Sequence, residues 1–237
     1  MVCATMFRFK QFEIRDELSA MKIGTDGVLL GAWVNISNAR TILDIGTGTG
    51  LVALMCAQRN AEATIEGIDI VEDAVIEARK NVANSPWLER ITITHSDIRS
   101  YNADMLYDHI VSNPPFFHSS LHSPDAARTT ARHTTTLSYL DLITASERLL
   151  RPEGRLSVVL PTDCAMQFRR VAFERLWLRR ITDVVTREGE TPKRTMMEFQ
   201  LTTTPLMPRH NTLTIHHADG SYTEQYRRIT EEFYLNF

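Results

Sequence analysis

The stretch Asp44-Ile45-Gly46-Thr47-Gly48-Thr49-Gly50 decides the fold of this 237-residue chain. Before it, residues 41–45 predict a short buried strand, and after it residues 51–58 predict a helix. Glycines at such a junction let the backbone turn tightly and approach a ligand without Cβ clashes. The helix N-terminus then offers unpaired N–H groups to a carboxylate or a phosphate. We therefore predict a ligand-binding turn formed by Asp44, Gly46, Gly48 and Gly50.

Two further acids follow the next two predicted strands. Asp69 ends the second strand, where a carboxylate can hold both hydroxyls of a ribose, and Asp97 follows the third, where it can accept from an adenine amino group. Ile70 and Ile98 come directly after these acids and could enclose the adenine. The dinucleotide fingerprint G-x-G-x-x-G requires glycine at position 51, which is Leu51, so a nicotinamide-dependent oxidoreductase is disfavoured.

Outward from this turn, segments of strand character alternate with segments of helical periodicity. The expected strands are residues 41–45, 63–68, 91–94, 108–112, 156–160, 180–187, 195–203 and 212–216. The expected helices are residues 51–58, 71–82, 138–150, 164–176 and 222–233. This alternation predicts an α/β protein with a mostly parallel, doubly wound sheet. Because no helix fits between the strands at 180–187 and 195–203, we also predict a terminal antiparallel hairpin.

The motif Asn113-Pro114-Pro115-Phe116 follows the fourth predicted strand and therefore emerges at the same sheet edge as the glycine turn. The Asn113 side-chain oxygen and the Pro114 carbonyl can each accept one N–H of an amino group, which stabilises charge that develops on the nitrogen. The two prolines keep both acceptors aimed, and Phe116 can stack on a planar base. A Pro-Pro turn that merely ends a strand is the other interpretation, which the glycine turn and the acids disfavour.

Composition and charge exclude several classes of protein. The chain has no apolar stretch of the roughly 18 residues that a membrane span needs and no secretory signal, so we expect a cytoplasmic protein. Three scattered cysteines lack metal-ligand spacing, and no metal site is expected. Residues 148–194 hold eleven basic and six acidic residues, a net charge of +5 within a chain of net charge −3. That asymmetry indicates either phosphate binding or solvated helix faces.

The glycine turn and Asn113-Pro114-Pro115-Phe116 together resemble the class I methyltransferases with an N-P-P-[FYW] signature. Over the whole chain, including Phe7–Gln11, residues 21–27 and residues 231–235, the sequence is similar to the bacterial tRNA adenine-N6 methyltransferases that modify adenosine 37 of valine tRNA. The resemblance implies a Rossmann-like domain over residues 1–237. Within it, residues 1–40 would flank the cofactor site and residues 205–237 would form a C-terminal extension.

The resemblance also implies roles for individual residues. The cofactor would be S-adenosylmethionine, held by the turn 44–50, Asp69, Asp97 and Asn113, with weaker contacts from Lys22, Thr25 and Asp26. The catalytic residues would be Asn113, Pro114, Pro115 and Phe116. The partner would be the anticodon loop of valine tRNA, in which the target base is already unpaired. No membrane and no obligate protein partner is expected.

The residues that contact RNA are the least specified part of the site. Arg128, Arg132 and His133, in a long segment without periodicity, are candidates for phosphate contacts, and so are Lys193 and Arg194. For each single arginine, an ordinary surface ion pair is the competing interpretation. Three other functions remain open from the residues: N-methyl transfer to guanine N2 of ribosomal RNA, transfer to a protein glutamine amide, and a non-catalytic RNA-binding module.

Overall fold

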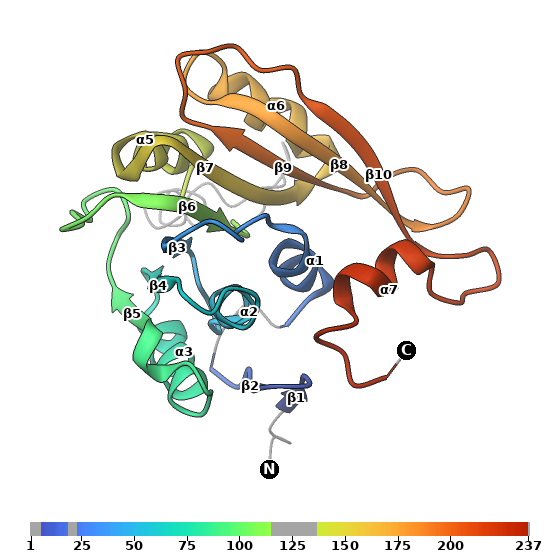
Figure 1. The fold of residues 1–237 in the computed structure, drawn as a ribbon, viewed down its shortest axis with the longest axis horizontal. Helices are drawn as coiled ribbons and strands as arrows, with labels where there is room; N and C mark the ends of the chain where they lie inside the picture. The colour runs from blue at the N-terminus through green and yellow to red at the C-terminus, as the bar shows by residue number, and fades with distance from the viewer. Residues whose placement is uncertain (1–5, 19–22, 115–136, 237) are drawn as a thin grey trace, which may run out of the picture.

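The computed structural model describes residues 6–18, 23–114 and 137–236. Their elements, in chain order, are β1 (Met6–Arg8), β2 (Glu13–Arg15), α1 (Thr25–Trp33), β3 (Thr41–Ile45), α2 (Leu51–Arg59), β4 (Thr64–Asp69), α3 (Glu72–Ala83), the 3-10 turn η1 (Leu88–Arg90), β5 (Ile91–His95), β6 (Tyr107–Ser112), α5 (Tyr139–Leu149), β7 (Leu150–Pro161), α6 (Thr162–Ala172), β8 (Trp177–Arg187), β9 (Arg194–Gln200), β10 (Arg209–His216) and α7 (Glu224–Thr230). Figure 1 shows their arrangement.

A central sheet of eight strands, in the order β10-β8-β9-β7-β6-β3-β4-β5, organises the fold. The five strands from β7 to β5 pair in parallel, and β9 pairs antiparallel with both β7 and β8. The predictions of a mostly parallel sheet and of a terminal antiparallel hairpin are therefore confirmed. β10 then adds to β8 in parallel and forms the sheet edge beyond that hairpin.

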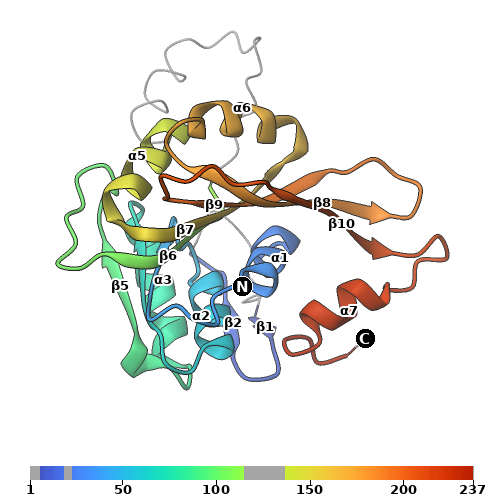
Figure 2. The same cartoon turned by 45° about the horizontal axis from the view of Figure 1, so that its top comes forward.

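Helices cover both faces of the sheet, as expected for a doubly wound fold. Figure 2 shows α5 and α6 on one face and α1, α2, α3 and α7 on the other. The core accordingly divides into two clusters: Leu142, Ile143 and Phe168 belong to the first face, and Leu30, Leu54 and Val75 to the second. None of the described helices is long and apolar enough to cross a membrane.

Helix α1 was not among the predicted elements. Six of its nine residues are buried, so it has no polar face and no amphipathic stripe from which a helix could be recognised. Its glycines allow close packing on α2, since a Cβ at Gly31 would lie 2.7 Å from Sδ of Met55 and one at Gly27 would lie 3.0 Å from Leu51. α1 is thus pressed against the helix that begins at the glycine turn.

Several element boundaries differ by a few residues from the predictions, and for two of them the backbone geometry gives the reason. β7 begins at Leu150, directly after α5, and its register against β6 shifts between Tyr107 and His109. This bulge accommodates Pro152, which we expected to precede the strand. α6 ends at Ala172 rather than near residue 176, because Glu174 adopts a positive φ of 65°.

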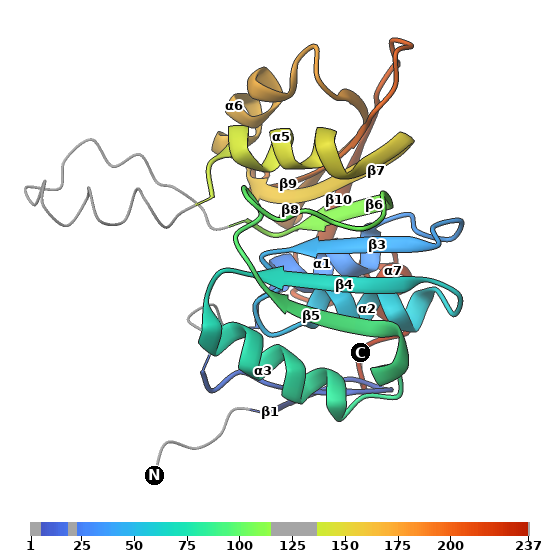
Figure 3. The ribbon, with the colours of Figure 1, turned by 90° about the vertical axis from the view of Figure 1, so that its left-hand side faces the viewer.

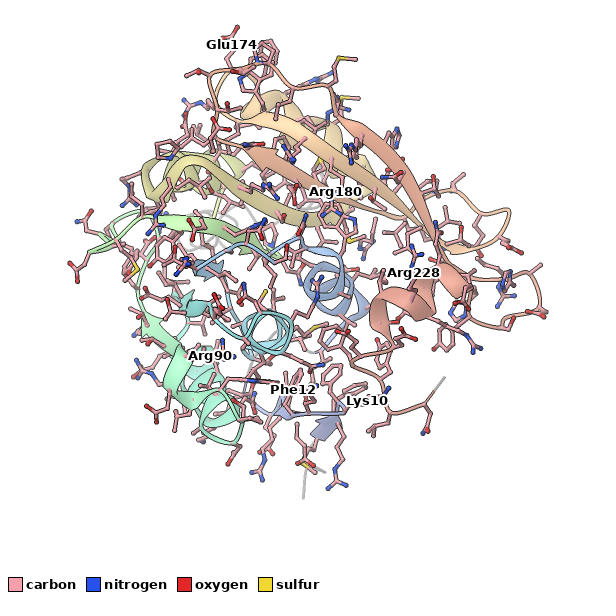
Figure 4. The ribbon with its side chains drawn as sticks, in the orientation of Figure 1. Lys10, Phe12, Arg90, Glu174, Arg180 and Arg228 are labelled. Carbon is pink, nitrogen blue, oxygen red and sulfur yellow. The ribbon has the colours of Figure 1, made fainter. Side chains whose placement is uncertain are left out.

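Aromatic side chains join the two ends of the chain. Phe9 stacks on Phe12 at 4.7 Å and on Tyr234 at 6.1 Å between ring centroids, and Lys10 donates to the Glu231 carbonyl at 2.6 Å. In Figure 4, Lys10 and Phe12 lie next to each other at the turn between β1 and β2, below α2. The N-terminal hairpin, an element that we did not predict, therefore packs with the C-terminal tail.

Candidate active site

The predicted site residues converge at the carboxyl edge of four neighbouring strands. Ile45 pairs with Ile68 on β4 and with Ser112 on β6, and Ile68 in turn pairs with Thr94 on β5. The segments that follow these residues therefore leave the sheet at one edge, as Figure 3 allows the reader to trace. They are the glycine turn, Asp69, Asp97 and Asn113, which the sequence analysis placed together.

The glycine turn has the backbone conformation that its sequence predicts. Gly46 and Gly48 have φ values of 72° and 55°, in the left-handed region that L side chains rarely adopt. The amides of Gly46 and Thr47 both donate to the Ile68 carbonyl, at 2.8 and 3.0 Å. A Cβ at Gly46 would meet nothing within 4 Å. The turn thus leaves open space beside its backbone that a ligand can occupy.

Asp44 lies beneath this turn and not beside the open space. Its side chain is 1% exposed and accepts a hydrogen bond from the Thr47 hydroxyl at 2.7 Å. Burial raises the pKa of Asp44 to about 7, although the Thr47 hydroxyl and the Ala53 amide oppose the shift. The position indicates that Asp44 supports the turn from within. A direct contact between Asp44 and a cofactor stays a prediction.

The raised pKa makes a prediction about stability. The folded protein binds a proton at Asp44 more tightly than the unfolded chain does between the ordinary pKa of 3.8 and about 7. The free energy of unfolding should therefore fall as pH rises through this window, by at most about 1.4 kcal/mol per pH unit, and become independent of Asp44 above it. Urea unfolding of wild type and Asp44→Asn between pH 4.5 and 8 measures this difference.

Asp44→Asn keeps an acceptor oxygen for Thr47 but cannot ionise, so its advantage over wild type should grow with pH up to about 7. His109, which burial shifts to a pKa of about 3, contributes the opposite slope between its ordinary pKa of 6.5 and 3. Because His109 is present in both proteins, its contribution cancels in the comparison. Parallel pH curves for the two proteins would show that Asp44 does not titrate in this range.

Asp69 connects the glycine turn to the end of β4. One carboxylate oxygen accepts from the Gly48 amide and the other from the Val71 amide, both at 2.9 Å. These bonds orient the carboxylate at the rim of the turn. Of the two isoleucines expected to enclose an adenine, Ile70 is 42% exposed, while Ile98 is 5% exposed and packs in the core beneath α5. Ile98 therefore offers little free surface to a ligand, and the enclosure stays a prediction.

Asp97 is engaged by a residue that the sequence analysis did not single out. Arg99 donates from Nε to both carboxylate oxygens at 2.9 Å, and its Nη2 and the Asp97 carboxylate form an ion pair. The hydrogen bonds from Arg99 hold the pKa of Asp97 below its ordinary value. The carboxylate expected to meet an adenine amino group is thus ionised and held in one orientation.

Asn113 follows directly after β6 and carries an unused acceptor. Its side-chain oxygen Oδ1 is buried and has no hydrogen-bond partner among the residues that the structure describes. The Ser112 hydroxyl, itself buried, donates to the Ile45 carbonyl at 2.8 Å and fixes the end of the strand. A buried oxygen without a donor is costly, so its place at the open edge indicates that a ligand donates to it. Pro114 is buried beside it, while Pro115 and Phe116 lie outside the described residues.

The N-terminus of α1 reaches the same edge and is held by β9. Arg194 forms an ion pair with Asp26, with 2.7 Å between Nε and Oδ2. The structure thus pairs Asp26, a predicted cofactor residue, with Arg194, a predicted RNA contact. Thr25 is exposed at the start of the helix, and Lys22 lies outside the described residues.

Most of the basic side chains in residues 148–194 form ion pairs. Seven of these eleven side chains pair with described acids. Glu198, 3% exposed, lies within 4.0 Å of three of them, Arg155, Arg179 and Arg180. Arg180 also stacks on Trp33 of α1 at 3.6 Å, and Figure 4 shows it between β8 and that helix. The solvated or ion-paired interpretation therefore accounts for most of this charge.

Lys193 remains the better placed of the two described candidates for RNA contact. It is 62% exposed, and its nearest acid, Glu190, is 3.5 Å away. The other candidates, Arg128, Arg132 and His133, lie outside the described residues. No group of histidine, cysteine, aspartate and glutamate in the described part of the chain could hold a metal ion.

Asn81 is a further site residue that the sequence analysis missed. Its side-chain amide donates to the carbonyls of Thr49 and Arg15, both at 2.9 Å, and its oxygen accepts from the Arg15 amide at 2.9 Å. It therefore ties the glycine turn to Arg15, the last residue of β2. The signal was present in the sequence: Asn81 is a polar residue three positions after Ala78 and next to Val82, on the buried face of α3.

Comparison with known proteins agrees with this geometry. Residues 19–176 match the methyltransferase small domain family. The chain is 46% identical over 231 residues to the tRNA1(Val) (adenine(37)-N6)-methyltransferase of Phocaeicola vulgatus, covering 97% of each chain. It is 42% identical to the enzyme of that name from Aeromonas hydrophila, with the same coverage. A solved structure described as a predicted O-methyltransferase from Agrobacterium tumefaciens superposes with a TM-score of 0.68 at 20% identity, over 88% of this chain and 96% of the other, which bears on the fold alone.

Proposed function

Because the chain belongs to the family of the tRNA1(Val) (adenine(37)-N6)-methyltransferases, we propose that it transfers a methyl group from S-adenosylmethionine to the N6 amine of adenosine 37 in the anticodon loop of valine tRNA. One structural observation carries the proposal. The buried Asn113 oxygen, at the carboxyl edge beside the glycine turn, has no donor among the described residues, and an amino group supplies one.

The residues at this edge fit S-adenosylmethionine. The open space beside Gly46 admits a ligand, and the Asp69 carboxylate at the rim of the turn suits ribose hydroxyls. The Asp97 carboxylate, one strand further along, suits the adenine amine. When bound, S-adenosylmethionine supplies an electrophilic methyl group on its sulfonium.

The residues of this chain orient the adenine amine and stabilise the charge that develops on it. An exocyclic amine of adenine is a weak nucleophile because its lone pair is delocalised into the ring. Asn113 Oδ1 and the Pro114 carbonyl each accept one N–H, which favours a tetrahedral nitrogen and stabilises the positive charge that develops on it. Asn113 is uncharged and cannot take the proton, so the methylated nitrogen loses it to solvent. Fixing the amine in line with the methyl group supplies much of the remaining rate enhancement.

The protein surface next to the site is suited to contact RNA phosphates through Lys193. Lys193→Ala should weaken tRNA binding and reduce the slope of log K against log salt by about 1. Arg194→Ala should change this slope less, because the Arg194 guanidinium is already ion-paired with Asp26. Binding measured between 50 and 200 mM salt tests both variants, with Lys80→Ala on α3 as the control. An unchanged slope for Lys193→Ala would exclude the contact.

The test of the proposed function is methyl transfer from radiolabelled S-adenosylmethionine to tRNA that lacks endogenous modification. We expect label in N6-methyladenosine at position 37 of valine tRNA. Label in ribosomal RNA or in protein glutamine, with none in tRNA, would overturn the assignment of substrate. Binding of tRNA without any transfer would leave only a non-catalytic RNA-binding module.

A further inference from the structure

The turn that follows β5 is rigid and carries the ion pair between Asp97 and Arg99. The amides of Ser100 and Tyr101 donate to the Asp97 carbonyl at 3.0 and 2.9 Å. From α5, Arg148 donates to the carbonyl of Ile98 at 2.9 Å and to that of Tyr101. Hydrogen bonds within the turn and from α5 thus hold the backbone, and the Asp97 side chain is directed by its partners within the turn.

Arg99 occupies most of the acceptor positions of that side chain. A carboxylate offers about four lone pairs, two on each oxygen. Oδ1 accepts from the Arg99 backbone amide and from Nε, both at 2.9 Å. Oδ2 accepts from Nε and from Nη2. Because the single Nε hydrogen is shared between the two oxygens, three N–H groups of Arg99 engage the carboxylate, and about one of its four acceptor positions remains for a donor from outside the described residues.

We propose that Arg99 is a positioning residue for the cofactor: it holds the Asp97 carboxylate so that its remaining acceptor position takes one N–H of the adenine 6-amino group. This inference rests on the proposed function, since it takes Asp97 as the acid that meets the adenine. A guanidinium that bridges both oxygens fixes the plane of the carboxylate, which a single point charge does not do.

The geometry makes Arg99 necessary for recognition of the amine and not for the fold. The Arg99 side chain is 36% exposed, and that of Asp97 is 30% exposed, so neither fills the core. Without Arg99, the carboxylate can rotate about its side-chain torsions and bind water in place of the ligand. The contribution of the 6-amino group to affinity should then be lost, while contacts to the ribose and the methionine part remain.

Calorimetry with two ligands tests this inference. One ligand is S-adenosylhomocysteine, and the other is its analogue with hydrogen in place of the 6-amino group. Wild type should bind S-adenosylhomocysteine about tenfold more tightly than the analogue. Arg99→Gln should lose about tenfold in affinity for S-adenosylhomocysteine and less than about twofold for the analogue. Arg99→Lys, which restores the charge without the bridging geometry, should recover only part of the preference.

Arg175→Gln is the matched control. Arg175 is paired with Glu147 at 2.7 Å on a similarly exposed surface between α5 and α6, so its loss should change neither affinity. Equal losses for both ligands with Arg99→Gln, or no loss, would overturn the role of Arg99 and leave the proposed function standing. Failure of wild type to bind S-adenosylhomocysteine at all would overturn both.

Discussion

Replacing Asn113 with alanine is expected to lower kcat for methyl transfer by about 10²–10³-fold, the cost of removing one preorganised group that stabilises transition-state charge. The structure explains the size of the effect. Oδ1 is buried and has no donor among the described residues, so it is free to bind the amine. The backbone around it is fixed by the sheet pairing and by Ser112. Initial rates at saturating tRNA and S-adenosylmethionine measure the change.

Two comparisons separate catalysis from folding in that experiment. Asn113→Asp keeps an acceptor oxygen at the same place and should retain more activity than Asn113→Ala. Asn113→Ala should keep the unfolding midpoint of wild type to within the shift that about 1 kcal/mol produces, because no hydrogen bond within the described protein is lost at Oδ1. Asn113→Asp should unfold more easily, because it buries a carboxylate that has no donor among the described residues. A rate for Asn113→Ala within about threefold of wild type would contradict the role of Oδ1 as acceptor.

Replacing Asp69 with alanine is expected to weaken binding of S-adenosylhomocysteine by about 100-fold. Two losses combine. The carboxylate no longer accepts from ribose hydroxyls, and the Gly48 amide loses the acceptor that holds the turn in its left-handed conformation. Bonds to an ionised acceptor contribute about 1.5–3 kcal/mol each, so the loss of the ribose contacts accounts for most of the effect. Calorimetry with S-adenosylhomocysteine measures it directly, without RNA.

A matched control lies four residues further along the chain. Asp73 is an exposed acid in the first turn of α3, and Asp73→Asn should leave the affinity within about twofold of wild type. An analogue of the ligand without the ribose 2′-hydroxyl should bind wild type more weakly than S-adenosylhomocysteine does. Asp69→Ala should lower the affinity for this analogue by a smaller factor than it lowers the affinity for S-adenosylhomocysteine. Equal effects of Asp69→Ala on both ligands would show that Asp69 holds the glycine turn and does not contact the ribose hydroxyl.

Short-range patterns were enough to predict the layout of the site. A buried strand has few residues and ends at a recognisable turn, so the acid or amide that follows it can be read directly from the chain. Asp69, Asp97 and Asn113 were placed in this way. Parallel strands then bring these ends to one edge as a matter of topology, which the pairing of Ile45 with Ile68 and Ser112 confirms.

Long-range contacts were not predictable in the same way. α1 has no polar face, so its helical character depends on burial against α2 and β7, which the local pattern does not contain. The pair Arg194–Asp26 spans 168 residues, and nothing near either residue indicates its partner. The basic stretch 148–194 likewise appeared as one charged region, although its strands carry half of its ten arginines to acids elsewhere in the fold.

The amino-acid sequence was therefore sufficient for the order of strands and helices from β3 to α7, for the glycine turn, and for the identity of the acids and the amide at the strand ends. Each of these depends on residues within one or two turns of chain. Tertiary structure decided how those groups are presented. It buried Asp44 beneath the turn, left Oδ1 of Asn113 without a partner in the described part of the chain and paired Arg194 with Asp26. These outcomes depend on which segments pack together and exclude water, and burial and pairing are properties of the whole fold.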